Sequence, residues 1–170
     1  MRIHTALLVL SLVAWLPVQA NAATVNLTAS LDGPSANAGA GTGSPGLGSA
    51  TIDFDTTTKV LSWNITWSGL NGSPTAMHFH GPATPVQSAG VQVGVGVAGP
   101  PVIGNEVLTA GQEADLLAGL YSLNLHTSTD PGGEIRGQVL VIVTGPSLGP
   151  LGIAAVLSLL GLAIHRKLRA

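Results

Sequence analysis

The chain contains no cysteine, and charged and aromatic residues are scarce. Of its 170 residues, 8% are charged and 4% are aromatic. Without cysteine no disulfide can form, so packing, hydrogen bonds or a bound ion must hold any folded domain together. Glycine (23 residues) and proline (11 residues) are plentiful. Because both residues interrupt helices and supply turn geometry, the composition favours many short strands joined by turns.

Basic residues are almost absent from the middle of the chain. All eight carboxylates lie there, but of the six Lys and Arg residues only Lys59 and Arg136 do. The central part is therefore acidic, which argues against nucleic acid as a partner because phosphate binding requires a basic face. The remaining cations lie near the two ends, where a basic residue beside an apolar run is typical of membrane topology.

Residues 1–22 have the pattern of a signal peptide. Arg2 provides the positive start, residues 6–16 form an apolar core, and Ala20-Asn21-Ala22 is a small-x-small cleavage site. The core is shorter than the roughly 20 residues that a membrane span requires. We therefore expect export with cleavage after Ala22, or after Ala20 as second choice. An uncleaved anchor is the alternative.

Residues 145–170 form a second terminal segment, with two prolines, an apolar run over 151–164 and a basic end. Counted from Leu148, the run would reach about 25 Å as a helix, which is marginal for a bilayer. The segment resembles the C-terminal sorting tails of PEP-CTERM-type bacterial surface proteins, although it lacks the Pro-Glu-Pro signature. We expect one hydrophobic C-terminal helix that tethers the chain to the membrane and leaves the domain outside, on the periplasmic or extracellular face. Processing by a sorting protease is a hypothesis.

Between these segments, residues 23–144 read as one β-domain. Alternation of apolar and polar residues predicts strands over 24–31, 50–54, 60–68, 76–80, 91–97, 121–126 and 134–143. Residues 33–48 read as a long loop, and 112–120 as a short helix. Trp63 and Trp67 share one face of their strand and are expected in the core, while Gly94 and Gly96 suggest a close approach by a neighbour. The pattern predicts an all-β antiparallel Greek-key sandwich or barrel, immunoglobulin-like or superoxide-dismutase-like.

Three histidines are the candidate functional residues of this domain. His78 and His80 stand two residues apart, so on a strand they point to the same face. His126 follows Asn124 on a later strand and shares its face. If these strands are neighbours, three neutral imidazoles could converge on copper or zinc. The alternative is structural: the histidines would hydrogen-bond Glu134, Asn124 or backbone groups and fix the strand pairing.

Two blocks of sequence resemble the CHRD (chordin-type) domain family. They read His78-Phe79-His80-Gly81-Pro82-Ala83, and Asn124-Leu125-His126-Thr127 followed by Pro131-Gly132-Gly133-Glu134-Ile135-Arg136-Gly137-Gln138. The resemblance covers most of residues 23–143 and implies an extracellular or cell-surface β-domain. The His-x-His strand also resembles, locally, the copper-site strand of Cu/Zn superoxide dismutases.

Arg136 stands two residues after Glu134, and strand alternation would place both on one face. One interpretation is a Glu–Arg–His network that orients the hairpin. The other interpretation is that these residues hold the ligands of a metal ion in place, or that Arg136 faces an anion beside the metal.

Two functions follow from these features. The first, which we favour, is a non-catalytic, membrane-tethered surface module that binds a protein, a polysaccharide or a metal ion. The second is a copper- or zinc-dependent activity, redox chemistry included, at His78, His80 and His126. No nucleophile elbow, phosphate loop or carboxylate pair for acid–base chemistry appears in the sequence.

Overall fold

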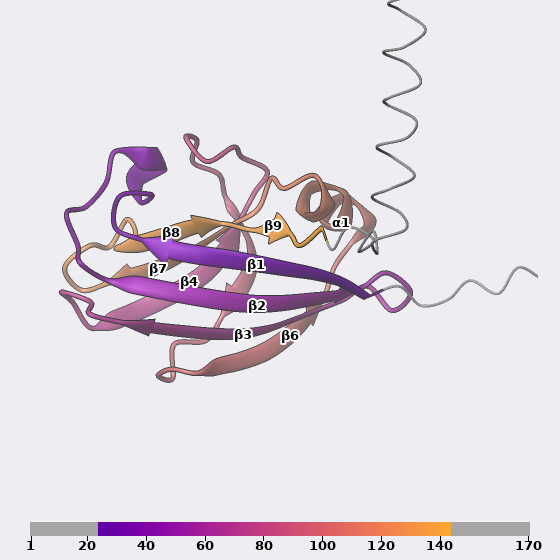
Figure 1. Ribbon diagram of the computed structural model, residues 1–170, viewed down its shortest axis with the longest axis horizontal. Coiled ribbons are helices and arrows are strands. Elements are labelled where there is room, and N and C mark those ends of the chain that lie inside the picture. The colour runs from indigo at the N-terminus through magenta and orange to yellow at the C-terminus, as the bar shows by residue number, and fades with distance from the viewer. Residues whose placement is uncertain (1–23, 144–170) are drawn as a thin grey trace, which may run out of the picture.

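Nine antiparallel strands form one continuous sheet in the computed structural model, which describes residues 24–143 (Figure 1). They are β1 (Thr24–Asp32), β2 (Leu47–Asp55), β3 (Val60–Ser68), β4 (Pro74–His80), β5 (Val91–Val95), β6 (Val102–Val107), β7 (Ser122–Thr127), β8 (Ile135–Gln138) and β9 (Leu140–Val141). The order across the sheet is β5-β4-β7-β8-β1-β2-β3-β6, and β9 pairs with β1. The predicted all-β antiparallel class is confirmed.

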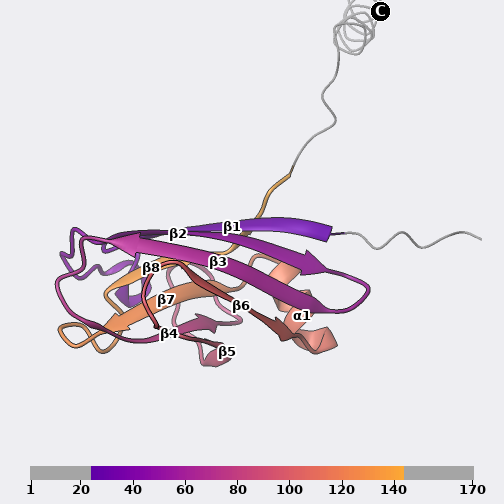
Figure 2. The ribbon, with the colours of Figure 1, turned by 90° about the horizontal axis from the view of Figure 1, so that it is seen from below.

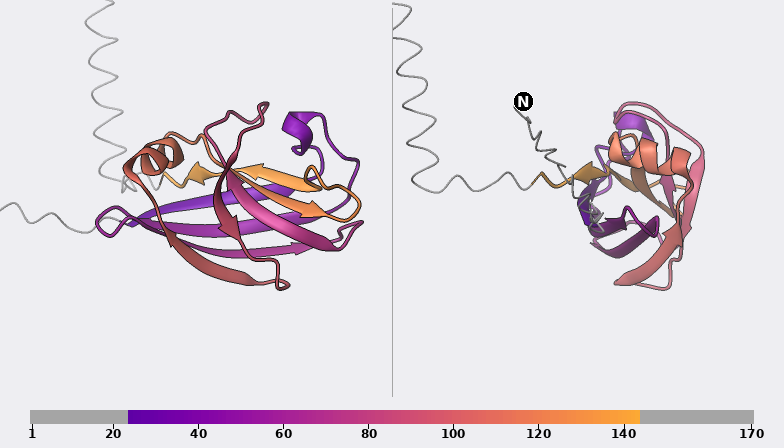
Figure 3. Two further views of the ribbon diagram at one scale, coloured as in Figure 1. Left: turned by 180° about the vertical axis from the view of Figure 1, so that it is seen from behind. Right: turned by 90° about the vertical axis from the view of Figure 1, so that its right-hand side faces the viewer.

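The sheet curls into a nearly closed barrel whose two free edges are β5 and β6. Strands β1, β2, β3 and β6 lie in one layer, and β4, β5, β7 and β8 lie in the other (Figure 2). Seen along the barrel, the strands surround a central core (Figure 3). The Greek-key order and the finer likeness to immunoglobulin or superoxide dismutase folds stay predictions.

Alternate residues of each strand point into this core, as the period-2 pattern predicts. Leu27, Ile52, Leu61, Phe79 and Leu123 are all fully buried. Burial of such a side chain stabilises the fold by about 2 kcal/mol.

The two tryptophans of β3 differ in their burial. Trp63 lies in the core, with its ring edge-on to Phe79 at a centroid separation of 5.5 Å. Trp67 is only partly buried and packs against the outside of the core cluster. The prediction that both are core residues therefore holds fully for Trp63 and in part for Trp67.

A short helix, α1 (Ala110–Leu117), lies at one end of the barrel (Figures 2 and 3). Thr109 caps it in a capping box with Gln112, and Leu116 is its fully buried anchor. An ion pair of 2.9 Å joins Lys59 of the β2–β3 turn to Glu113. The helix begins two residues before the predicted start because the capping box, rather than Gln112 itself, defines its first turn.

Four local predictions differ from the structure. The single strand expected over 134–143 is divided into β8 and β9. Strand β6 was not expected, and β2 begins at Leu47, inside the predicted loop. Within 33–48 the chain forms a single 3-10 turn, η1 (Asn37–Gly39). Apart from the chain neighbours, no atom lies within 4 Å of a Cβ added at Gly94 or Gly96, so the expected close approach at these glycines is absent.

The predicted signal peptide (1–22) and hydrophobic C-terminal helix (within 145–170) lie outside the described residues. Across residues 24–143, no helix has the length and apolar character needed to cross a bilayer.

Candidate metal centre

The candidate site lies on the outer face of three neighbouring strands, β4, β7 and β8. Met77 and Phe79 of β4 point into the core, so His78 and His80 point outward. The register pairs His78 with Asn124 of β7, and Asn124 with Arg136 of β8. Residues opposite each other in an antiparallel pair share a face. The two histidine-bearing strands are therefore neighbours, which is the condition that the sequence set for convergence of the imidazoles.

The structure brings the three predicted histidines together. Each offers a ring nitrogen, and these three nitrogens lie within 4.8 Å of one another. The ring centroids are 5.6 Å apart for His78 and His80, 5.2 Å for His78 and His126, and 5.7 Å for His80 and His126. In a tetrahedral centre with metal–nitrogen bonds near 2.0–2.1 Å, ligand nitrogens lie roughly 3.3 Å apart. Metal binding would therefore have to draw the three nitrogens closer together.

Backbone carbonyls fix two of the imidazoles. His80 Nδ1 lies 3.0 Å from the carbonyl oxygen of Ala89, and His126 Nδ1 lies 2.9 Å from that of Pro131. A carbonyl oxygen only accepts, so in each neutral ring Nδ1 carries the proton and Nε2 carries the lone pair. This is the arrangement that metal-ligating histidines adopt, with one nitrogen donating outward and the other free for the metal.

The nitrogens that face the cluster have no hydrogen-bond partner. They are Nδ1 of His78 and Nε2 of His80 and of His126, and all three are buried. A buried polar atom without a partner costs about 1–3 kcal/mol, so native folds rarely leave one unexplained. Seven buried polar atoms of the described residues lack a partner, and three of the seven belong to this one cluster.

Burial and neighbouring charges keep His78 and His80 neutral near pH 7. Burial lowers the pKa of His78, and the positive charges that His126 and His80 would carry lower it further. Burial also lowers the pKa of His80 against the opposing effect of its bond to Ala89, with added contributions from His126 and Arg136. Neutral imidazoles are the form that binds a metal ion.

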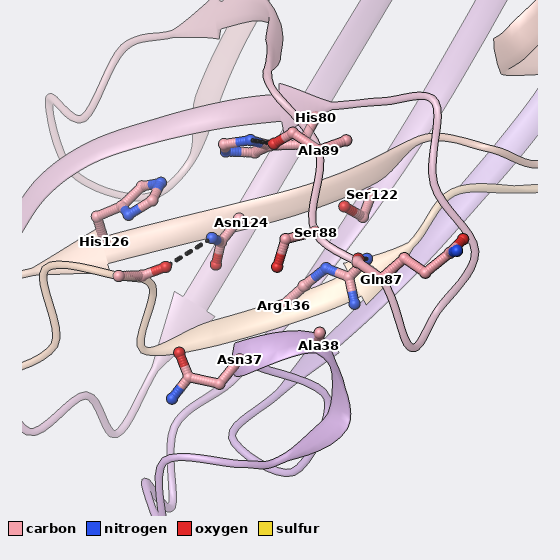
Figure 4. Close-up of a pocket in the computed structure, with 11 residues that line it drawn as sticks. Asn37, Ala38, His80, Gln87, Ser88, Ala89, Ser122, Asn124, His126 and Arg136 are labelled. Atoms are coloured by element: carbon pink, nitrogen blue, oxygen red, sulfur yellow. Dashed lines mark hydrogen bonds between the residues drawn. The ribbon is translucent and has the colours of Figure 1, made fainter.

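A pocket of about 130 Å³ adjoins the histidines. Figure 4 shows His80 and His126 on one side of it, the segment of Gln87, Ser88 and Ala89 along another, and Asn37 and Ala38 of η1 on a third. Ser122, Asn124, Gly132 and Arg136 complete the wall. No acidic side chain lines this pocket.

Arg136 holds the loop that covers the pocket. It is 6% exposed, and its guanidinium donates to the carbonyls of Pro85, Gln87 (3.2 Å) and Thr84 (3.5 Å), and to that of Ser35 (3.4 Å). The same loop carries the Ala89 carbonyl that orients His80.

The profile of the CHRD domain matches residues 27–139, well over half of the chain. The chain belongs to the CHRD domain family. No curated protein and no solved structure gives a significant match. The fold and the three-histidine cluster described above are thus features of a CHRD domain.

Glu134, in the second of the two CHRD-like sequence blocks, holds loops of the domain together and forms no hydrogen bond with the histidines. It is fully buried and accepts four hydrogen bonds: from Ser44 Oγ (2.6 Å), Thr127 Oγ1 (2.7 Å), and the backbone N–H groups of Asn71 (2.6 Å) and Gly72 (3.1 Å). Burial alone would raise the pKa of Glu134, but these hydrogen bonds outweigh burial and hold the pKa below its usual value. The carboxylate ties three separate loops together.

The expected Glu–Arg–His network does not form in the described chain. None of the partners of Glu134 is a histidine or Arg136. Strand alternation placed Glu134 beside Arg136, but β8 begins only at Ile135. Glu134 therefore lies in the preceding turn, where alternation no longer decides the direction of a side chain.

Other residues of this second block have equally specific roles. Gly133 has a φ of 121°, and an added side chain there would collide with Asn124. A side chain at Gly137 would strike the carbonyl of Ser30 on β1. Gln138 donates to the carbonyls of Ala83 (2.9 Å) and Gly119 (2.7 Å). Asn124 Nδ2 donates to Gly132 O (3.2 Å), so this predicted residue ties the hairpin beside the cluster.

Several residues of the site were not predicted from the sequence. The carbonyls of Ala89 and Pro131 have no side-chain signature, so only the fold reveals them. Ser122, Gln87 and Ser88 are polar residues of ordinary type in a pocket wall. His126 shares its face with Asn124, as the alternation predicted.

Proposed function

We propose that this CHRD domain is a transition-metal-binding module with His78, His80 and His126 as protein ligands. The observation that supports the proposal is the convergence of three buried, unpartnered imidazole nitrogens. Imidazole suits zinc and copper, whereas calcium and magnesium take oxygen ligands, which this cluster does not offer. Two of the rings are already oriented by backbone carbonyls, so little ordering would accompany metal binding.

We further propose that the module acts outside the membrane. The signal-like residues 1–22 and the apolar, basic-ended residues 145–170 support an exported domain that is tethered to the membrane or held at the cell surface. There the domain would bind a metal ion in a structural or binding role, with an extracellular protein or polysaccharide as further partner.

A second candidate is a copper- or zinc-dependent activity, for which redox chemistry is one option with copper. Catalytic zinc sites have three protein ligands and a free fourth coordination position, whereas structural zinc sites have four protein ligands. The pocket that opens beside His80 and His126 favours this candidate.

Thermal unfolding of the metal-stripped protein tests the proposal. At a free Zn²⁺ or Cu²⁺ concentration a hundredfold above Kd, binding to the folded state adds about 2.7 kcal/mol. For a domain of this size we expect Tm to rise by roughly 10 °C. Mg²⁺ is the control and should leave Tm unchanged, because the three imidazoles offer no oxygen ligand and Mg²⁺ binds imidazole poorly. No rise with either transition metal, or an equal rise with Mg²⁺, would overturn the proposal.

A further inference from the structure

The pocket between the histidine cluster and Arg136 has an unbalanced positive charge once a metal is bound. The three imidazoles are neutral ligands, so a divalent ion would keep its full charge. Arg136, which is always protonated, lines the same pocket. Its hydrogen bonds go to backbone carbonyls, which orient the guanidinium and leave its charge uncompensated.

No carboxylate neutralises this charge in the described part of the chain. The ion pair found within residues 24–143 joins Lys59 to Glu113, away from the pocket. Asp32 is the cross-strand neighbour of Arg136 on β1, but its carboxylate accepts the N–H of Ser35 at 2.7 Å. Asp32 forms no ion pair with Arg136 and does not line the pocket.

The size and wall of the pocket restrict what can supply the missing negative charge. The pocket, of about 130 Å³, has room for several waters or for a small polyatomic ion. The walls are polar, with Ser88, Ser122 and Asn124 among them, so an apolar ligand is disfavoured. The protein ligands also leave a coordination position of the metal free.

We propose that this pocket is a binding site for a small anion, which coordinates the metal and faces the positive charge of Arg136. The inference rests on the proposed metal site and adds the chemical class of its external ligand. Arg136 attracts the anion by its charge, while its hydrogen bonds hold the loop over residues 84–87 as the pocket wall. The negative charge of the anion offsets part of the positive charge of the metal and of Arg136. The three imidazoles cannot do so, because they are neutral.

Titration of the Cu²⁺-loaded full-length protein with azide tests this inference. Azide bound to copper gives a charge-transfer band, and its growth measures the affinity, while copper content is measured separately. Arg136→Gln removes the charge and should weaken azide binding on the order of tenfold, as expected for a unit charge lost in a site of reduced dielectric. Arg136→Lys keeps the positive charge and should lose less azide affinity than Arg136→Gln. Lys59→Gln is the matched control, because it removes the same charge away from the pocket, and its azide affinity should equal that of the wild type.

The outcomes separate this inference from the metal proposal. A protein that holds copper but binds no azide, or equal azide affinity in Arg136→Gln and Lys59→Gln, overturns the anion site and leaves the metal site standing. A protein that binds no copper overturns both. If Arg136→Gln does not fold, Ser88→Asp decides, because it places a carboxylate in the pocket wall and should weaken azide binding by a comparable factor. An azide affinity unchanged in Ser88→Asp would contradict an anion site in this pocket.

Discussion

His78→Ala is expected to lower the affinity for copper or zinc by about a hundredfold or more, while the metal-free protein unfolds at nearly the same temperature as the wild type. Mutation of a residue that only hydrogen-bonds a metal ligand already lowers metal affinity about 10–100-fold. Loss of a ligand itself should therefore lower metal affinity by at least the upper value. Metal-free stability should change little, because the His78 imidazole hydrogen-bonds no other residue within 24–143 and its Nδ1 is buried without a partner.

Competitive titration against a coloured chelator measures the affinity, and thermal unfolding measures the stability. His165→Ala is the matched control, since it removes an imidazole from outside the described domain. It should leave both quantities unchanged. A His78→Ala variant that is strongly destabilised without metal, yet retains wild-type metal affinity, would favour the structural interpretation of the histidines.

Glu134→Gln should destabilise the domain by about 2–4 kcal/mol. Each carboxylate oxygen accepts one hydroxyl and one backbone N–H: Oε1 from Ser44 and Asn71, Oε2 from Thr127 and Gly72. A glutamine amide must turn its NH₂ group toward one of these N–H groups, so a donor then faces a donor. Loss of charge-assisted hydrogen bonds and an unsatisfied buried donor each cost about 1–3 kcal/mol. Denaturant unfolding measures the effect.

The same carboxylate makes stability depend on pH in the acid range. Its pKa is lower in the folded chain than its ordinary value of 4.5. Its contribution is therefore complete above about pH 4.5 and is lost as the pH falls through the folded pKa. Glu134→Gln should remove this part of the acid dependence. Glu113→Gln, which breaks the partly exposed ion pair with Lys59, is the control and should cost less than about 1 kcal/mol. Equal costs for the two substitutions would refute the role given to Glu134.

Strand alternation predicted the centre of the site because its period determines faces. His78 and His80 were placed together, and His126 with Asn124, from spacing alone, and the register of β4 with β7 brings the two sets into contact. The same rule failed for Glu134, which lies one residue before β8. A period applies only within a strand, and the sequence does not mark the residue at which β8 begins.

The edge strand β6 and the loops were harder to predict than the central strands. In β6 the apolar Ile103 is 72% exposed while Val102 is buried, so adjacent apolar residues hide the alternation. β2 begins in a stretch rich in glycine, serine and proline that reads as a loop until it pairs with β1. The loop that supplies the Ala89 carbonyl is held by Arg136 from a strand about fifty residues later. Such long-range polar contacts leave no pattern in the local sequence from which they could be predicted.

X-ray absorption at the copper or zinc edge of the loaded protein tests the central claim most directly. We expect imidazole scattering from three histidine nitrogens at about 2.0–2.1 Å, with an oxygen or nitrogen atom of an external ligand completing the shell. In His126→Ala the number of imidazole nitrogens should fall by one or the metal should be lost. A first shell with fewer than three imidazoles in the wild type, or a spectrum unchanged in His126→Ala, would contradict the central claim.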